Sequence, residues 1–405
     1  MILSELISIK DAFKIMDKTQ KVKDCEIIPL EDSHLRVLGE DIHSYHDSPP
    51  FDKSAMDGYA LIAKDTFGAS TDTPKTLNII EEIGAGDFSE KEISDNEAIR
   101  IATGAPIPKG ADAVLMEEFT ASNGDKIEIH TQVPPSENIV PQGEDIKKGK
   151  KILVKGTILK PSEIGLIASA GYAKIKVYKK PKVKLLITGN ELVNPSKTIE
   201  KAQIINSNKY LISSMIRSIG GIVDTEHLRD DADLVKIAIL KASKEFDIVL
   251  TTGGTAISKG DVIVDVIDSI TDVLFHGVGV RPGRPIAYAE VENTPIFMLS
   301  GYPIAAISQF DIFIRRYIFK MQSLNYDPTI VKRESKVKIP SDLGRTDYVR
   351  AFTDDKYIIR ASNKGSGIIH SMVQSNSYLI IDDNSEGIEK GDMSNIIFFK
   401  SMLLY

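Results

Sequence analysis

The stretch VKLLITG (residues 183–189) decides how the central part of the chain folds. A short apolar run that ends in a glycine is typical of a strand buried on both faces of a sheet. Two later stretches, DIVLTTGG (247–254) and PIFMLSG (295–301), repeat the pattern. Between and after these runs, apolar residues recur at helical spacing, in residues 206–221, 231–246, 261–270 and 308–321. This alternation predicts an α/β domain with a parallel, doubly wound sheet and helices on both of its faces.

The three predicted strands all end in glycine, and in a parallel sheet these ends lie on one edge. Ligands bind beyond this carboxyl edge, where glycines let backbone N–H groups approach anionic oxygens. For a single loop, a glycine that simply ends a strand is an equally good interpretation, but three such loops favour a site. A Walker phosphate loop is excluded because no GK[ST] sequence follows any of the strands. The candidate substrate-binding residues at this edge are Gly189, Thr252, Gly253, Gly254, Gly301 and Pro303.

Acidic residues lie beside the same strand ends. Glu191 follows the first strand, Asp230 and Asp231 precede a predicted helix, and Asp261 precedes another. Helix capping is the alternative role for the three aspartates, whereas Glu191 precedes no predicted helix. Carboxylates at a phosphate site commonly hold Mg²⁺, which prefers oxygen ligands. The sequence therefore predicts a magnesium site with Glu191, Asp230 and Asp261 as candidate ligands.

Two arginines flank a Pro-Gly turn in VRPGRPIAY (280–288). Arg281 and Arg284 are spaced so that two guanidinium groups can clamp a phosphate or another oxyanion with paired hydrogen bonds. A solvated turn explains the pattern about equally well, so the pair is a candidate substrate-binding element.

The flanking regions have different patterns. Apolar residues at helical spacing predict a first helix within residues 8–20, and short β-like runs broken by turn residues extend from about 27 to 140. After about residue 327 short strands return, which predicts a small C-terminal β barrel or sandwich. Asp57 and Thr103 in the first β module each precede a glycine, and Asp145 comes after Gly143, a context that by itself indicates only turns.

Composition excludes several classes of function. The chain of 405 residues carries 50 Lys and Arg against 57 Asp and Glu, a net charge of −7, so nonspecific nucleic-acid binding is not expected. Cys25 is the only cysteine, which rules out an intrachain disulfide or a cysteine metal cluster. The start of the chain lacks the pattern of a signal peptide, and no apolar run has the length of a membrane span. We expect a cytoplasmic protein.

Seven blocks, taken in order, resemble the MoeA family, to which the C-terminal part of gephyrin is also similar. They are SAMDGYA (54–60), ATGAPIPKGADAVLMEE (102–118), QGEDI (142–146), ITGNEL (187–192), TTGG followed by Asp261, RPGRP (281–285) and GRTDYVRA (344–351). The resemblance covers essentially the whole chain. It implies four domains: an elongated one from residues 1–26 and 140–178, an inserted, mainly β domain at 27–139, an α/β domain at 179–326 similar to MogA, and a C-terminal β barrel at 327–405.

The resemblance also implies an activity. Family members are homodimers that take adenylylated molybdopterin and molybdate, release AMP with Mg²⁺, and leave molybdenum on the dithiolene sulfurs. By motif matching, the catalytic residues are Asp57, Thr103, Asp145, Glu191, Asp230 and Asp261. Arg281 and Arg284 match positions where the family uses basic residues, and Arg350 and Ser371 are further candidate substrate contacts. Other proteins of molybdenum cofactor biosynthesis are candidate partners.

The chain departs from the family at a few of these positions, and alternatives stay open. Asn190 stands where relatives often have Asp, and Gly277 where many have Lys. A preference for tungstate over molybdate is not decided by the sequence, because the two oxyanions are nearly the same size. The alternative functions are a molybdopterin adenylyltransferase and a noncatalytic scaffold of the gephyrin kind.

Overall fold

The computed structural model describes residues 6–253, 262–362, 365 and 369–402. These residues divide into two compact units. Unit 1 contains Met1–Ile27, Leu35–Gly39 and Lys176–Tyr405, and unit 2 contains Ile28–His34 and Glu40–Ile175. The finer division into four domains stays a prediction. Within the described ranges, no helix combines the length and the apolar character that crossing a membrane requires.

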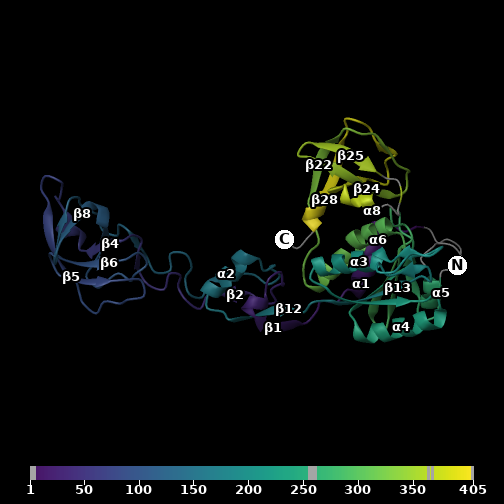
Figure 1. Cartoon of the computed structure of the whole chain (residues 1–405), viewed down its shortest axis with the longest axis horizontal. Helices are drawn as coiled ribbons and strands as arrows, with labels where there is room; N and C mark the ends of the chain where they lie inside the picture. Colours follow the sequence, from purple (N-terminus) through teal and green to yellow (C-terminus); the bar gives the residue numbers. More distant parts are fainter. Residues whose placement is uncertain (1–5, 254–261, 363–364, 366–368, 403–405) are drawn as a thin grey trace. The chain divides into compact units, whose positions relative to one another are not determined.

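A six-stranded sheet forms the centre of unit 1 (Figure 1). Its strands, in spatial order, are β16 (Ile222–Leu228), β13 (Lys182–Thr188), β17 (Ile248–Thr252), β21 (Thr294–Leu299), β20 (Ala287–Val291) and β18 (Val273–His276). The first four are parallel to one another, which confirms the predicted arrangement, and β20 runs antiparallel to both of its neighbours, β21 and β18. The antiparallel edge arises at the turn Glu292–Asn293, where both residues have positive φ, as a tight two-residue hairpin requires.

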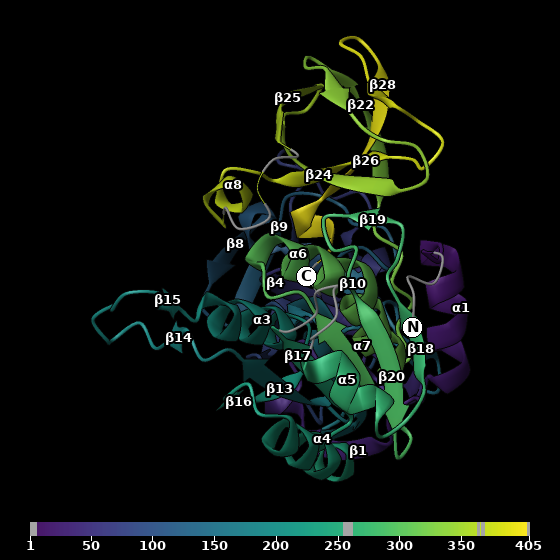
Figure 2. The ribbon, with the colours of Figure 1, turned by 90° about the vertical axis from the view of Figure 1, so that its right-hand side faces the viewer.

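Helices cover both faces of this sheet (Figure 2). On one face α4 (Ala232–Glu245) and α5 (Val262–Asp268) pack over a core that includes Val235, Ile263 and Met298. On the other face α3 (Ser207–Ser218) packs against α6 (Pro303–Gln309). The sequence pattern of residues 206–221 and 231–246 therefore predicted real helices with buried apolar stripes.

The closing helix of this domain differs from the single helix predicted for residues 308–321. It consists of α6, a π-helical segment Phe310–Ile314, and α7 (Arg315–Met321). The wider turn carries a fully buried Asp311, which pairs with Arg315 at 2.5 Å and accepts a hydrogen bond from Tyr378 Oη at 2.9 Å. Burial raises the pKa of Asp311, and the guanidinium and the phenol oppose this rise. The irregular helix thus joins the α/β domain to the C-terminal strands.

The C-terminal strands form a closed barrel, which confirms one of the two predicted forms. Pairing of β24 (Thr346–Thr353) with β26 (Ser377–Ile381) closes the sheet, and β19 (Val280–Arg281) of the α/β domain extends it alongside β24. The barrel strands in spatial order are β24 (Thr346–Thr353), β25 (Tyr357–Ser362), β22 (Ile330–Ser335), β28 (Met393–Phe398) and β26 (Ser377–Ile381).

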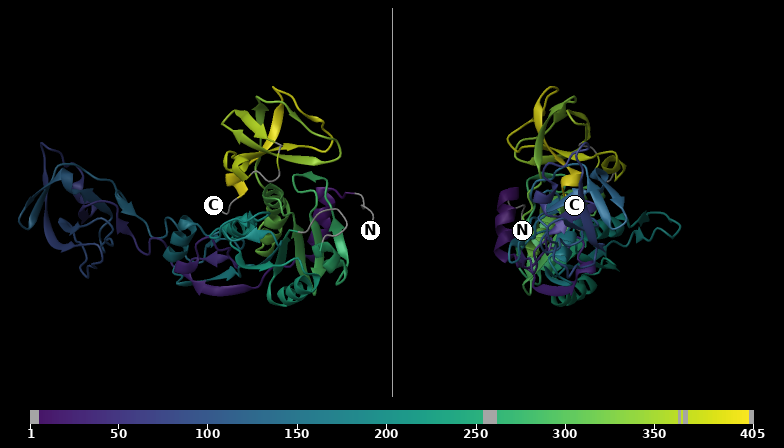
Figure 3. Two further views of the ribbon diagram at one scale, coloured as in Figure 1. Left: turned by 45° about the vertical axis from the view of Figure 1, so that its right-hand side comes forward. Right: turned by 90° about the vertical axis from the view of Figure 1, so that its left-hand side faces the viewer.

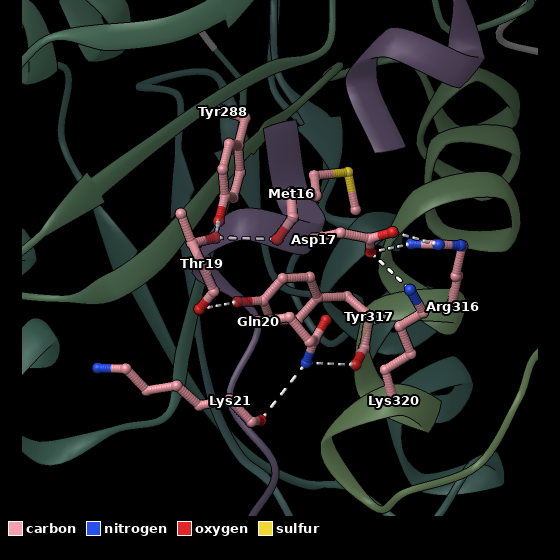
Figure 4. Close-up of polar contacts among 9 residues, drawn as sticks. All are labelled: Met16, Asp17, Thr19, Gln20, Lys21, Tyr288, Arg316, Tyr317 and Lys320. Carbon is pink, nitrogen blue, oxygen red and sulfur yellow. Dashed lines mark hydrogen bonds and ion pairs between the residues drawn. The ribbon is translucent and has the colours of Figure 1, made fainter. Parts of the chain in front are cut away.

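Helix α1 (Ile9–Thr19) confirms the predicted N-terminal helix, and the Ser8 hydroxyl caps it by accepting from the Asp11 N–H. Its last turn docks on the α/β domain through polar contacts (Figure 4). Asp17 pairs with Arg316 at 2.7 Å and with Lys320 at 2.7 Å. These ion pairs lower the pKa of Asp17 from 3.8 to about 2.

Unit 2 is mainly β, as predicted (Figure 3). Its six-stranded sheet has the order β7 (Ala113–Met116), β4 (Gly58–Leu61), β6 (Glu97–Ile101), β5 (Lys75–Ile83), β9 (Lys126–Ile129) and β8 (Thr120–Asn123). Helix α2 (Pro161–Ser169) also belongs to this unit, and it begins at a proline, which is well suited to the first position of a helix.

Candidate functional site

The three glycine-ended strands are direct neighbours in the sheet. Strand β17 lies between β13 and β21, and all three run in the same direction. Gly189, Gly253 and Gly301 therefore follow three adjacent strand ends on one edge, as predicted. Gly253 has φ +99°, and a Cβ atom there would lie 2.5 Å from the carbonyl oxygen of Thr188. A Cβ on Gly301 would lie 3.4 Å from Gly253 Cα, so glycine lets these backbones pack closely.

A buried amide from α3 links two of these strand ends. Asn208 Nδ2 donates to Thr252 Oγ1 at 2.9 Å and to Gly301 O at 2.8 Å. Thr252 Oγ1 in turn donates to Ser300 O at 3.2 Å. Asn208 is not among the residues predicted from the sequence, because an asparagine in a first helical turn has the pattern of an ordinary capping residue.

A second buried amide, Gln309 at the end of α6, reaches the same edge. Its Oε1 accepts from the Ser300 N–H at 2.8 Å, and its Nε2 donates to Gly283 O at 2.8 Å. The side chain is fully buried. Gln309 was also missed, because an isolated glutamine in an apolar helix gives no sign of its distant partners.

The acidic residues are arranged around the end of β13. Gly189 has φ +145°, and a Cβ atom there would lie 2.8 and 2.9 Å from the two carboxylate oxygens of Glu191. The absent side chain therefore leaves room for this carboxylate. The Asn190 N–H donates to Asp230 Oδ2 at 3.0 Å, and the Asp230 N–H donates to Asn190 Oδ1 at 3.4 Å. An aspartate in place of Asn190 would put a second negative charge beside Asp230.

The other acidic candidates have different placements. Asp231 caps α4 by accepting from two backbone N–H groups, as the alternative interpretation predicted. Asp261 and Gly254 lie outside the described residues. In the described part of the chain, no three His, Cys, Asp or Glu side chains form a group able to hold a metal ion. Glu191 and Asp230 are exposed and supply the carboxylate oxygens that Mg²⁺ prefers, so this part of the donor set fits that ion.

The two arginines of the turn at residues 281–284, called the RPG turn below, have different surroundings in the structure. Arg281 pairs with Asp347 of the barrel, a fully buried carboxylate. Asp347 also accepts from Ser341 Oγ at 2.7 Å and from Arg345 Nε at 3.2 Å. Arg284 is exposed, and its guanidinium has no partner among the described residues. Arg284 is therefore the member of the pair that is available to an anion.

The remaining candidates of unit 1 lie on α6, in the barrel and on a short helix. Pro303 is the first residue of α6. Arg350 on β24 is only 2% exposed, and burial lowers the pKa of its guanidinium. Ser371 lies on α8 (Ile369–Val373), which contacts α6, and its carbonyl oxygen accepts from Ser375 Oγ at 2.7 Å.

Unit 2 brings two of its three candidates together. Asp57 Oδ1 accepts from the Thr103 N–H at 2.7 Å and from Thr103 Oγ1 at 2.9 Å. The Thr103 backbone N–H, followed by its hydroxyl, lowers the pKa of Asp57. Asp145 lies in a separate turn, where its N–H donates to Ser48 O at 3.0 Å and its side chain is exposed.

Comparisons with known families agree with this architecture. The model of the MoeA N-terminal region (domain I and II) matches residues 7–171. The model described as "Probable molybdopterin binding domain" matches residues 184–320, which include the glycine-ended strands. The model of the MoeA C-terminal region (domain IV) matches residues 332–399.

Individual relatives match over nearly the whole chain. A protein of Staphylococcus aureus strain COL named molybdopterin molybdenumtransferase is 33% identical over 98% of this chain and 96% of its own. The protein of that name from Bacillus subtilis strain 168 is also 33% identical, over 97% of this chain and 94% of its own. A crystal structure of the molybdopterin biosynthesis MoeA protein from Pyrococcus horikoshii OT3 matches with a TM-score of 0.83 and 36% identity, over 98% of this chain and 100% of that chain. The chain described here belongs to the MoeA family.

Proposed function

We propose that the protein is a molybdopterin molybdenumtransferase, which transfers molybdenum from molybdate to adenylylated molybdopterin and releases AMP. The observation that carries the proposal is the edge formed by Gly189, Gly253 and Gly301, at the ends of three adjacent parallel strands. Doubly wound folds bind ligands at this position, and the full-length relatives bear the name of this activity. Homodimerisation stays a prediction.

Each group at the edge has a proposed part in this reaction. The glycine-rich backbone lets the phosphates and the pterin approach closely. Glu191 and Asp230 are the described residues that would hold Mg²⁺, with Asp261 as the further predicted ligand. When bound, this ion would neutralise the charge that develops on the leaving phosphate. Arg284 has an exposed guanidinium without a partner in the described part of the chain, and with it this residue binds molybdate or a phosphate.

The candidates of unit 2 have roles that rest on motif matching. Asp57 is held as a carboxylate by the two hydrogen bonds from Thr103, so it accepts a proton or orients a polar substrate group. Asp145 is exposed and contributes a further carboxylate. We place all three residues in the same reaction.

A substrate test separates this function from adenylyl transfer. The purified protein is supplied in one reaction with adenylylated molybdopterin, molybdate and Mg²⁺, and in another with molybdopterin, ATP and Mg²⁺. We expect AMP and a molybdenum-containing pterin in the first reaction, and unchanged ATP in the second. Adenylylated molybdopterin formed from ATP, without any molybdate-dependent AMP release, would overturn the proposal in favour of an adenylyltransferase.

A further inference from the structure

The side chain of Gln309 connects the RPG turn, at Gly283, to the strand end at Ser300. We propose that Gln309 is a positioning residue, which sets the RPG turn and its exposed Arg284 relative to the strand end at Ser300–Gly301. This inference rests on the proposed function, because it assigns the oxyanion contact to Arg284.

Both ends of the Gln309 amide are used. The Ser300 N–H can only donate, so it requires the Oε1 atom, and the Gly283 carbonyl can only accept, so it requires Nε2. These two partners fix the orientation of the amide. A fully buried side chain with a donor and an acceptor both satisfied holds its two loops at a defined separation.

The RPG turn also packs directly on this side chain. Gly283 has φ +109°, and a Cβ atom there would lie 2.8 Å from Gln309 Cγ and 3.3 Å from Ala305 O. Only glycine both adopts this backbone conformation readily and leaves space for the glutamine. The turn therefore packs closely on α6, and the hydrogen bond from Gln309 Nε2 to Gly283 O holds it there.

Arg284 follows immediately, and its backbone is held from both sides. Its own carbonyl oxygen accepts from the Val278 N–H at 3.0 Å. Three residues earlier, Arg281 is anchored on the buried Asp347. The backbone of the turn is thus fixed at Arg281, Gly283 and Arg284, while the guanidinium of Arg284 stays exposed. An anion-binding group on a fixed backbone loses less conformational entropy on binding.

The test compares Gln309→Met, which keeps the length of the side chain but removes both hydrogen bonds, with the matched control Gln322→Met. Gln322 is a second buried glutamine of the same domain, 2% exposed, with a longer hydrogen bond of 3.4 Å to Ile219 O. We expect Gln309→Met to raise the KM for adenylylated molybdopterin or molybdate about tenfold, and Gln322→Met to change neither by more than about twofold.

A double-mutant cycle with Arg284→Ala separates positioning from a general loss of stability. If Gln309 acts through Arg284, then Gln309→Met changes KM by less than about twofold once the guanidinium is gone. If the fold-increase in KM of the double variant equals the product of the fold-increases of the two single variants, Gln309 does not act through Arg284 and the proposal is overturned.

Hydrogen exchange gives a readout that does not depend on activity. Loss of the Gln309 acceptor is expected to speed exchange of the Ser300 amide at least about tenfold, while Gln322→Met leaves it unchanged. Unchanged Ser300 exchange in Gln309→Met overturns the positioning role whatever the activity. An absence of molybdate-dependent AMP release by the wild type overturns the proposed function alone, and the exchange result still decides whether Gln309 holds the strand end.

Discussion

Replacing Gly253 with alanine tests whether close packing of the strand ends shapes the candidate site. The substitution introduces two costs, because the backbone has φ +99° and the new Cβ atom would lie 2.5 Å from Thr188 O. Gly277 provides the matched control within the same domain. Its φ is +96°, but an added Cβ would approach closely only the end of the flexible Leu6 side chain, at 2.9 Å, and the nearest backbone atom, Arg284 O, would lie at 4.0 Å.

The comparison of the two variants isolates the backbone contact. A left-handed conformation costs a non-glycine residue about 1–2 kcal/mol, and both variants share this term. Only Gly253→Ala must also push one strand end away from its neighbour, and such overpacking costs a further ~1–3 kcal/mol. We therefore expect Gly253→Ala to lower the free energy of unfolding by ~2–5 kcal/mol and Gly277→Ala by ~1–2 kcal/mol.

The assay is urea unfolding followed by circular dichroism, together with the KM for adenylylated molybdopterin. Tryptophan fluorescence is not an option, because the sequence contains no tryptophan. Gly253→Ala should also raise KM more than Gly277→Ala does, since the shifted strand end carries the binding edge. Equal stabilities of the two variants, within about 0.5 kcal/mol, would refute the packing explanation.

Three carboxylates, those of Asp57, Asp17 and Asp347, make contacts whose loss should have a measurable effect. Asp57→Asn should reduce the rate of AMP release at least about 100-fold with unchanged thermal stability. Because Thr103 lowers the pKa of Asp57, the activity of the wild type should show no loss from protonation of this carboxyl until the pH falls below 3.8, the ordinary pKa of aspartate. Asp17 has a folded-state pKa of about 2 against 3.8 when unfolded, so its contribution is present above about 3.8 and is lost as the pH falls toward 2. The upper bound is about 2.5 kcal/mol, and solvent screening of the 37% exposed side chain reduces it to about 1 kcal/mol. The stability difference between wild type and Asp17→Asn should therefore be complete at a pH of about 6 and should shrink as the pH falls from about 3.8 toward 2. Asp347→Asn should destabilise the barrel by about 3 kcal/mol in urea unfolding, because it leaves Arg281 without its buried partner, and a loss below about 1 kcal/mol would contradict this role.

The sequence predicted those features that depend on neighbouring residues. The strand that precedes Gly189 and the helix capped by Asp231 are encoded by local patterns, and the structure contains both. Because strand direction then follows from strand–helix alternation, the shared carboxyl edge was also predictable. The predicted roles of Glu191 and Asp230 at this edge stay predictions.

Contacts between distant residues were not predictable in this way. Asn208 binds Gly301 across 93 residues, and Gln309 binds Gly283 across 26. Neither partner can be read from local spacing, since a buried amide and a solvated amide look the same in a sequence. The ion pair of Arg281 with Asp347 spans 66 residues, and it changes which arginine is available to a ligand.

The antiparallel edge and the π-helical segment were missed for related reasons. Strands β18 and β20 are short apolar runs, and nothing in their spacing fixes their direction. The π-helical turn at Phe310–Ile314 coincides with the buried contacts of Asp311, which come from the barrel as well as from its own helix.

The most direct measurement is molybdate-dependent release of AMP from adenylylated molybdopterin, with wild type compared with Glu191→Gln and the control Glu200→Gln. Glu200 lies nine residues further along in an exposed segment, so its substitution removes the same charge away from the strand end. We predict that release rises with molybdate in the wild type and in Glu200→Gln, and falls at least about 100-fold in Glu191→Gln. Equal release by all three proteins would contradict the assignment of the reaction to this edge.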